Sequence, residues 1–226
     1  MIRLYYLSRV EIDVLNRQRT HELTHLGAYH NWVEQSFPAE VAAKRRSRKL
    51  WRIDSLLGKR YLLILSESAP DLTKLGMYGV PGTAQTKPYD DFLAHLQTNQ
   101  IVRFRLTANP THTIESAGRR QGRIVPHITV EQQRQWLADR AEKAGFRLLN
   151  DQAPLFDDEQ SRQSFNVVGR DWPALWHGHR FMRLSRVTYE GRLQITDLSQ
   201  FRQTMTKGLG REKAYGMGLL TVIPEG

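Results

Sequence analysis

Hydrophobic and polar positions alternate with a period of two in several short segments, the pattern of half-buried strands. The clearest segment is IVRFRLTANP, where Val102, Phe104 and Leu106 alternate with arginine and threonine until Asn109-Pro110 ends the run. Further strands are predicted for YLSRVEIDVL, KLWRID, YLLILSES, FRLLN and LLTVIP, and for FMRLSRVTYEGRLQIT as two strands joined at Glu190-Gly191.

Other segments carry hydrophobic residues at helical spacing. Residues 20–37 place Leu23, Leu26, Val33 and Phe37 on one stripe, and Pro38 is expected to stop this helix. A second helix is predicted for TVEQQRQWLADRAEKAG, capped by threonine and ended by glycine, and a third for residues 197–207. Helices and strands mixed in this way predict an α+β protein of two similar units, residues 1–110 and 111–226.

Composition narrows the function. The chain has 226 residues, a formal net charge of +10 and no cysteine, which excludes disulfides, thiol nucleophiles and thiolate zinc sites. Arginine outnumbers lysine, and guanidinium groups both fork onto phosphates and stack on bases, so a nucleic acid is the favoured partner. The aliphatic runs are too short to cross a membrane, and MIRLYYLSRV is not typical of a signal peptide, so we expect a cytoplasmic protein.

The motif HELTH fits H-E-x-x-H, the zinc-binding pattern of metallopeptidases. On a continuous helix His21 and His25 would share a face, and Glu22 would be the general base on a zinc-bound water. The alternative is that both histidines are solvated helical residues. The motif arises easily by chance, which favours the second interpretation.

His30 lies within the apolar stripe of the first helix, where it is either a core residue or a proton-transfer group. Its neighbour Tyr29 either binds a ligand or packs. Arginines are concentrated in residues 103–123, and glycines with basic residues in residues 207–218. Either these groups contact phosphates, or the arginines form a solvated face and the glycines form tight turns. The candidate RNA-binding positions are Arg103, Arg105, Arg119, Arg120, Arg123, Lys207, Gly208, Gly210, Arg211, Lys213, Gly216 and Gly218.

Four motifs in this order resemble the CasE family, the CRISPR RNA-processing endoribonucleases of the type I-E Cascade complex. They are YLSRVEI, the H-x-x-V-x-x-x-F-P segment from His30 to Pro38, RFRLTANPT, and YEGRLQI followed by GLGREKAYGMGLLTVIP. The resemblance covers nearly the whole chain. It implies two tandem ferredoxin-like (RRM-like) domains.

The resemblance also implies an activity. CasE proteins cleave precursor CRISPR RNA at the base of the repeat hairpin without metal or cofactor, leave a 2′,3′-cyclic phosphate and stay bound as Cascade subunits. Their catalytic histidine falls on His30, with Tyr29 as a candidate helper, because Gly27 and Gln35 replace the family's tyrosine and lysine. Lys44, Arg45 and Arg46 are candidates for the missing cation. A non-catalytic RNA-binding subunit and a zinc peptidase stay open as alternatives.

Overall fold

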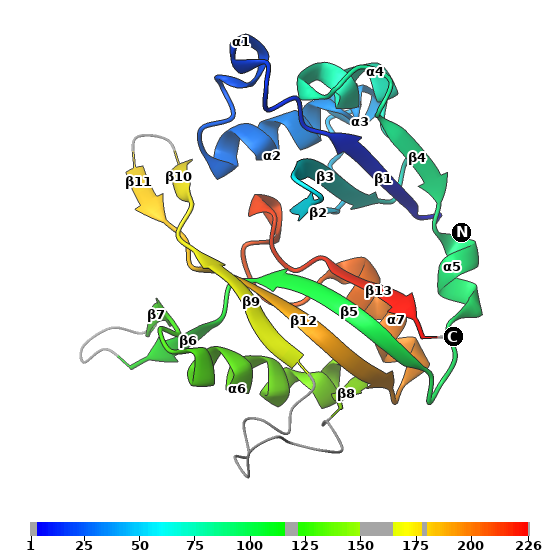
Figure 1. Cartoon of the computed structure of the whole chain (residues 1–226), viewed down its shortest axis with the longest axis vertical. Coiled ribbons are helices and arrows are strands. Elements are labelled where there is room, and N and C mark those ends of the chain that lie inside the picture. The colour runs from blue at the N-terminus through cyan, green and yellow to red at the C-terminus, as the bar shows by residue number, and fades with distance from the viewer. Residues whose placement is uncertain (1–3, 116–121, 150–164, 178–179, 226) are drawn as a thin grey trace.

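Two antiparallel sheets face each other and form the body of the molecule (Figure 1). The computed structural model describes residues 4–115, 122–149, 165–177 and 180–225. A buried arginine joins the sheets: Arg52 donates hydrogen bonds from Nη1 to the carbonyl oxygens of Arg105 at 2.9 Å and Leu219 at 3.0 Å. Within the described residues, no helix is both long and apolar enough to span a membrane.

The first sheet has the strand order β2-β3-β1-β4. Its strands are β1 (Tyr6–Glu11), β2 (Lys49–Leu56), β3 (Lys59–Ser66) and β4 (Gln85–Pro88). The helices of this half are α1 (Arg17–Thr20), α2 (Leu26–Gln35), α3 (Pro38–Ala42), α4 (Leu72–Leu75), the 3₁₀ helix η1 (Gly76–Tyr78) and α5 (Asp90–His95). Helices follow β1 and β3, while β2 and β3 form a hairpin, which is the ferredoxin-like arrangement.

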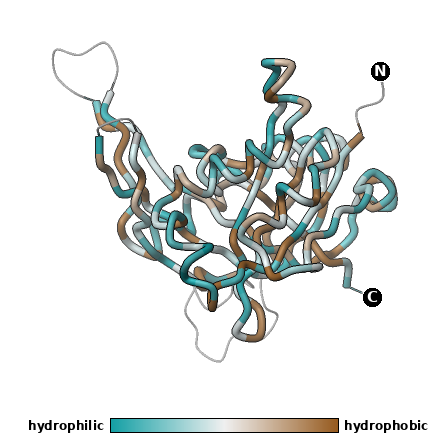
Figure 2. Tube along the Cα trace, turned by 90° about the horizontal axis from the view of Figure 1, so that it is seen from above, coloured by the Kyte–Doolittle hydropathy of each residue, from teal (hydrophilic) through white to brown (hydrophobic). Residues whose placement is uncertain are grey.

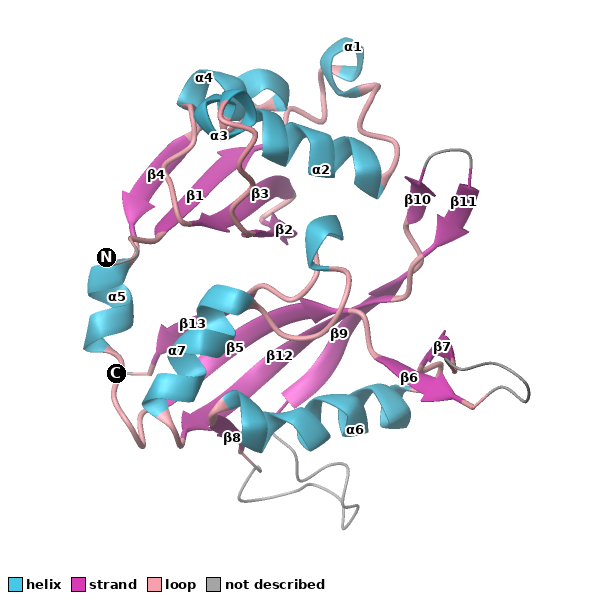
Figure 3. Ribbon diagram, turned by 180° about the vertical axis from the view of Figure 1, so that it is seen from behind, coloured by secondary structure: helices cyan, strands magenta, loops and turns pink. Residues whose placement is uncertain are grey.

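The second sheet repeats this plan, with the order β13-β5-β12-β8 and with β9 also paired to β12. Its strands are β5 (Ile101–Ala108), β8 (Phe146–Leu148), β9 (Phe165–Asp171), β12 (Arg186–Ile195) and β13 (Leu220–Pro224). Its helices are α6 (Val130–Ala141), η2 (Glu142–Ala144), α7 (Leu198–Lys207) and η4 (Lys213–Tyr215). Two hairpins project from it: β6 (Thr111–Ile114) with β7 (Arg123–Pro126), and β10 (Ala174–His177) with β11 (Arg180–Arg183) (Figure 3).

The helix signals of the second half are confirmed. Thr129 caps α6 by accepting a hydrogen bond from the backbone N–H of Gln132, in a complete capping box, and Gly145 ends the helical segment with φ +84°. Asp197 caps α7 in the same way, through the N–H of Gln200. These local signals predict helix ends well because they satisfy backbone groups that the helix leaves unpaired.

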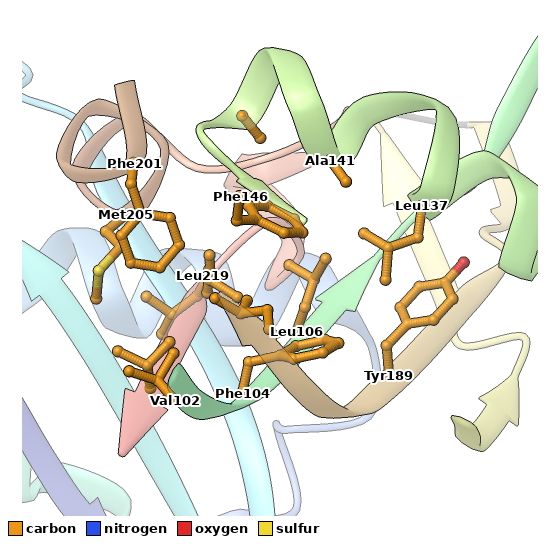
Figure 4. Packing of buried hydrophobic residues seen from close by; sticks show 14 of the residues in the cluster. Val102, Phe104, Leu106, Leu137, Ala141, Phe146, Tyr189, Phe201, Met205 and Leu219 are labelled. Carbon is orange, nitrogen blue, oxygen red and sulfur yellow. The ribbon is translucent and has the colours of Figure 1, made fainter. Parts of the chain in front are cut away.

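The core follows from the alternation of hydrophobic and polar positions in the strands, and hydrophobic and hydrophilic stretches lie close together along the coloured trace (Figure 2). Val102, Phe104 and Leu106 point from β5 toward α6 and α7, where they meet residues such as Leu137 and Phe201 (Figure 4). A second cluster lies between the first sheet and α2. Helices therefore cover the outer face of each sheet, and the inner faces look toward each other.

The expected helix over residues 20–37 is wrong in its continuity. Helix α1 ends at Thr20, the chain is extended at His25, and α2 begins at Leu26. The break has a tertiary cause, since Arg19 donates from Nε to the carbonyl oxygen of Met77 at 3.1 Å and ties α1 to η1. Helix α2 does end before Pro38, at Gln35, and Pro38 itself occupies the first turn of α3, where its missing N–H costs nothing.

Two further expectations are corrected. Glu190 and Gly191 form no turn, because both continue the ladder of β12 and lie opposite Arg105 and Phe104. Strand β5 pairs with β12 and β13 and so belongs to the second sheet. The chain passes from one sheet to the other between α5 and β5, ahead of the boundary expected at residue 110.

Candidate active site

Helix α2 places His30 at the edge of the first core. Leu26, Tyr29, Trp32 and Val33 are buried and fasten one side of the helix to the sheet. His30 itself is half-buried. The apolar contacts therefore fix the helix while leaving the imidazole partly accessible to solvent.

The glycine-rich segment brings the aromatic ring of Tyr215 next to His30. The ring of Tyr215, on η4, meets the imidazole edge-on with centroids 5.7 Å apart. Tyr215 was missed by sequence reasoning, although it lies inside the segment whose glycines were singled out. Its only signal there is an aromatic residue in an otherwise polar and glycine-rich stretch.

Tyr29 has a different environment from His30. It is 7% exposed, and its ring stacks on Trp51 with centroids 6.1 Å apart and lies 6.4 Å from Trp32. Of its two interpretations, the structure supports packing. We therefore leave Tyr29 out of the candidate site.

The four glycines between residues 208 and 218 all have positive φ, from +76° at Gly208 to +89° at Gly218. Gly216 also needs its missing side chain, because a Cβ there would lie 2.5 Å from the Trp51 ring. The indole Nε1 of Trp51 donates to the carbonyl oxygen of Ala214 at 3.0 Å. These glycines let the segment pack closely on β2, and this packing holds η4 beside α2.

Positive charge gathers on the same segment. Lys213 is half-buried, and burial together with the nearby charge of Arg48 lowers its pKa. Arg211 and Lys207 are exposed on the flanks, where Lys207 Nζ lies 3.4 Å from Gln203 Oε1. Lys213 and Arg48 carry like charges, and Lys213 is partly desolvated, so this place favours the binding of an anion such as a phosphate group.

Arg103 and Arg105 lie elsewhere. They project from β5 toward the first sheet, and Arg105 lines a cavity of about 580 Å³ between the sheets. The Arg105 guanidinium pairs with Glu190 and, at 3.2 Å, with Asp54. This cavity and α2 lie on opposite faces of the first sheet, so the structure does not bring these arginines to His30.

The third predicted basic group lies on the β6–β7 hairpin. Arg123 is exposed on β7, in the hairpin that projects beside the amino end of α6 (Figure 1). Arg119 and Arg120 lie outside the described residues. Arg123 therefore belongs to a projecting surface separate from His30.

The HELTH segment does not form the zinc-binding geometry. His21 follows the last residue of α1 and His25 precedes the first residue of α2, so no continuous helix aligns them. His21 Nδ1 lies 2.6 Å from the carbonyl oxygen of Gln18, and Glu22 accepts a hydrogen bond from Tyr78. Among the described residues, no group of three or more histidine or acidic side chains is arranged to hold a metal. The structure of this segment therefore gives the zinc-peptidase alternative no support.

Sequence reasoning also missed the β10–β11 hairpin, which rises beside the amino end of α2 (Figures 1 and 3). Leu175 anchors it in the core cluster of α2, while Trp176 and Phe181 are about half exposed, with ring centroids 5.1 Å apart. Arg180 and Arg183 are exposed on the same hairpin. Exposed aromatic and guanidinium groups together are typical of surfaces that bind RNA bases and phosphates.

Comparison with known proteins gives consistent matches over almost the whole chain. A family model described as CRISPR associated protein matches residues 5–224. The CRISPR-associated endoribonuclease Cse3 of Thermus thermophilus is 29% identical over 222 residues, which is 97% of this chain and 100% of the relative.

Solved structures match as well. Thermus thermophilus Cse3 bound to an RNA representing a pre-cleavage complex aligns with a TM-score of 0.76 and 26% identity, over 98% of this chain and 100% of that one. Cas6e of Escherichia coli aligns with a TM-score of 0.65 and 22% identity, over 97% and 100% of the two chains. The second match supports the fold alone.

Proposed function

The chain belongs to the CRISPR associated protein family, and from that premise we propose that it is an endoribonuclease that cleaves precursor CRISPR RNA at the base of the repeat hairpin. The observation that carries the proposal is the half-buried His30 on helix α2, which faces Tyr215 on the segment that also bears Lys213. The 29% identity to a CRISPR-associated endoribonuclease over both full lengths supports the same activity.

RNA supplies its own nucleophile for this reaction. The 2′-hydroxyl next to the scissile phosphate attacks the phosphorus, the bond to the 5′-oxygen breaks, and a 2′,3′-cyclic phosphate and a 5′-hydroxyl result. His30 transfers one of the two protons involved. Lys213 and the neighbouring Arg48 stabilise the negative charge that grows on the phosphate oxygens. Tyr215 fixes the orientation of the His30 ring by edge contact.

Recognition of the hairpin is assigned to the surfaces around this site. The deep groove of an A-form stem hides its base edges, so shape, phosphates and unpaired bases supply the contacts. The β10–β11 hairpin offers exposed arginine and aromatic side chains next to α2, and the glycine-rich segment offers Lys207 and Arg211. We assign the protein to a CRISPR RNA-guided complex in the cytoplasm, where it keeps its product bound.

The test is cleavage of the organism's own repeat hairpin by the purified protein. We expect a single cut at the stem base, a 2′,3′-cyclic phosphate on the product, and full activity in EDTA. A substrate with a 2′-deoxy residue at the cleavage site should bind equally and resist cleavage. Tight binding of the all-ribose hairpin without any cleavage would instead identify a non-catalytic RNA-binding subunit.

A further inference from the structure

A second histidine lies on the same surface as His30. The His25 ring is folded over the start of α2, so that its Cε1 and Nδ1 atoms lie 2.9 Å from where a Cβ on Gly27 would be. The ring therefore occupies the space that a side chain at position 27 would take. This arrangement depends on glycine at that position.

Position 27 and His30 are neighbours on one face of α2. Residues three apart in a helix have side chains about 5–6 Å apart, and helical side chains lean toward the amino end. His30 thus leans toward the space that the His25 ring fills. The His25 ring therefore occupies the side-chain position three residues before His30 on this face of the helix.

Within the part of the chain that the structure describes, no hydrogen bond accounts for this position of His25. It is the N-cap residue of α2, but its side chain makes no capping hydrogen bond. Its Nδ1 is buried and has no hydrogen-bond partner among the described residues. The carbonyl oxygen of Trp176 lies 3.4 Å from the same Cβ position, so the ring lies where the β10–β11 hairpin meets α2.

We propose that His25 is the second proton-transfer group of the cleavage reaction, an inference that rests on the proposed function. In-line attack places the entering 2′-oxygen and the departing 5′-oxygen on opposite sides of the phosphorus. One group on each side is then needed. One imidazole takes the proton of the 2′-hydroxyl as the O2′–P bond forms, and the other gives a proton to the 5′-oxygen as the P–O5′ bond breaks.

The test compares His25→Ala with His30→Ala on two substrates in single-turnover cleavage. The first is the ordinary hairpin, on which each variant should be at least about 10²-fold slower than the wild-type protein. The second carries sulfur in place of the bridging 5′-oxygen at the cut. A thiolate leaves without a proton, so the variant that lacks the general acid should regain most of its rate and the other should not.

His21→Ala is the matched control, because His21 is an exposed histidine four residues away whose Nδ1 lies 2.6 Å from the carbonyl oxygen of Gln18 in its own helical turn. It should cleave both substrates at the wild-type rate. Hairpin affinity, measured by gel shift, should stay within about twofold for all three variants. Loss of affinity in parallel with rate for His25→Ala would make it a binding residue and overturn the proposal.

Gly27→Ala tests the position without removing the imidazole. An added methyl group forces the His25 ring away, while alanine favours the helix more than glycine does. We expect slower cleavage, by 10-fold or more, in a protein whose melting temperature does not fall. This variant keeps the test valid if His25→Ala folds poorly.

The outcomes separate the two levels of inference. If the wild-type protein does not cleave the hairpin, the proposed function fails. If it cleaves and His25→Ala matches His21→Ala, or if sulfur restores both slow variants or neither, the division of proton transfer between His25 and His30 is wrong.

Discussion

The groove between the sheets and the surface around His30 both collect positive charge, but they hold it differently. In the groove, carboxylates neutralise the Arg105 guanidinium, which pairs with Asp54 and Glu190. Near His30, Lys213 is desolvated and lies close to the like charge of Arg48, which keeps its pKa low. The first arrangement is satisfied within the fold, whereas we expect an added anion to stabilise the second. Arginine content alone does not distinguish these two situations.

The largest expected effect is on the rate of RNA cleavage and concerns the surface around His30. His30→Ala should reduce single-turnover cleavage by about 10²- to 10⁴-fold, because a general acid or base is lost. The melting temperature and the hairpin affinity should barely change, since the His30 ring is only half-buried. His95→Ala serves as the control, because His95 is exposed on α5 and its Nδ1 lies 2.6 Å from the carbonyl oxygen of Asp91. Normal cleavage with a depressed melting temperature would make His30 a core residue.

A buried ion pair provides a purely structural reference. Lys49 Nζ lies 2.9 Å from Glu40 Oε2. Burial raises the pKa of the Glu40 carboxyl, but hydrogen bonds from Ser68, Lys49 and Ser47 together lower it by more. Glu40→Gln leaves Lys49 buried beside the more distant Glu34, so chemical denaturation at neutral pH should show a loss of about 3 kcal/mol. Cleavage per folded molecule should stay unchanged. A rate loss comparable to that of His30→Ala would extend the candidate site to this pair.

The same carboxyl predicts a pH dependence. Its hydrogen bonds lower the pKa of Glu40 from its ordinary 4.5 to about 2 in the folded protein. The stabilising effect is therefore complete above pH 4.5 and is lost as pH falls toward 2. The free energy of unfolding, measured between pH 5 and 2, should fall less steeply with decreasing pH for Glu40→Gln than for the wild-type protein. Equal slopes would contradict this assignment.

The smallest effect concerns the salt dependence of RNA binding. Lys213→Ala should lower the slope of log affinity against log salt by about 0.7–0.9, the contribution of one phosphate contact. Arg105→Ala should leave the slope unchanged and instead reduce stability by about 1 kcal/mol, because its partners are carboxylates of the protein. Titrations of both variants at several salt concentrations decide this. The reverse pattern would place the RNA in the groove.

Most of the fold could be predicted because its signals are local. The alternation in β5 and the caps at Thr129 and Asp197 depend only on neighbouring residues. The break before α2 could not be predicted, because Arg19 bonds to the backbone of a turn far along the chain. The continuity of β12 through Gly191 could not be predicted either, because it depends on pairing with β5 on one side and β9 on the other.

The candidate site shows the same limit. His30 could be singled out as a histidine on an apolar stripe, with the resemblance assigning it a role. The approach of Tyr215 could not be anticipated, because it depends on how closely Gly216 packs on Trp51. The roles of Arg105 and Tyr29 were equally hidden, since ion pairing and ring stacking depend on partners that only the folded chain supplies.

The hydrogen bond from Trp51 to Ala214 joins residues 163 positions apart. Contacts of such long sequence separation form late, after both units have been synthesised and docked. A chain still emerging from the ribosome can thus hold His30 on α2 without Tyr215 or Lys213 beside it. The candidate site is complete only when synthesis has passed residue 215, so we expect an emerging chain shorter than this to leave nearby RNA uncut.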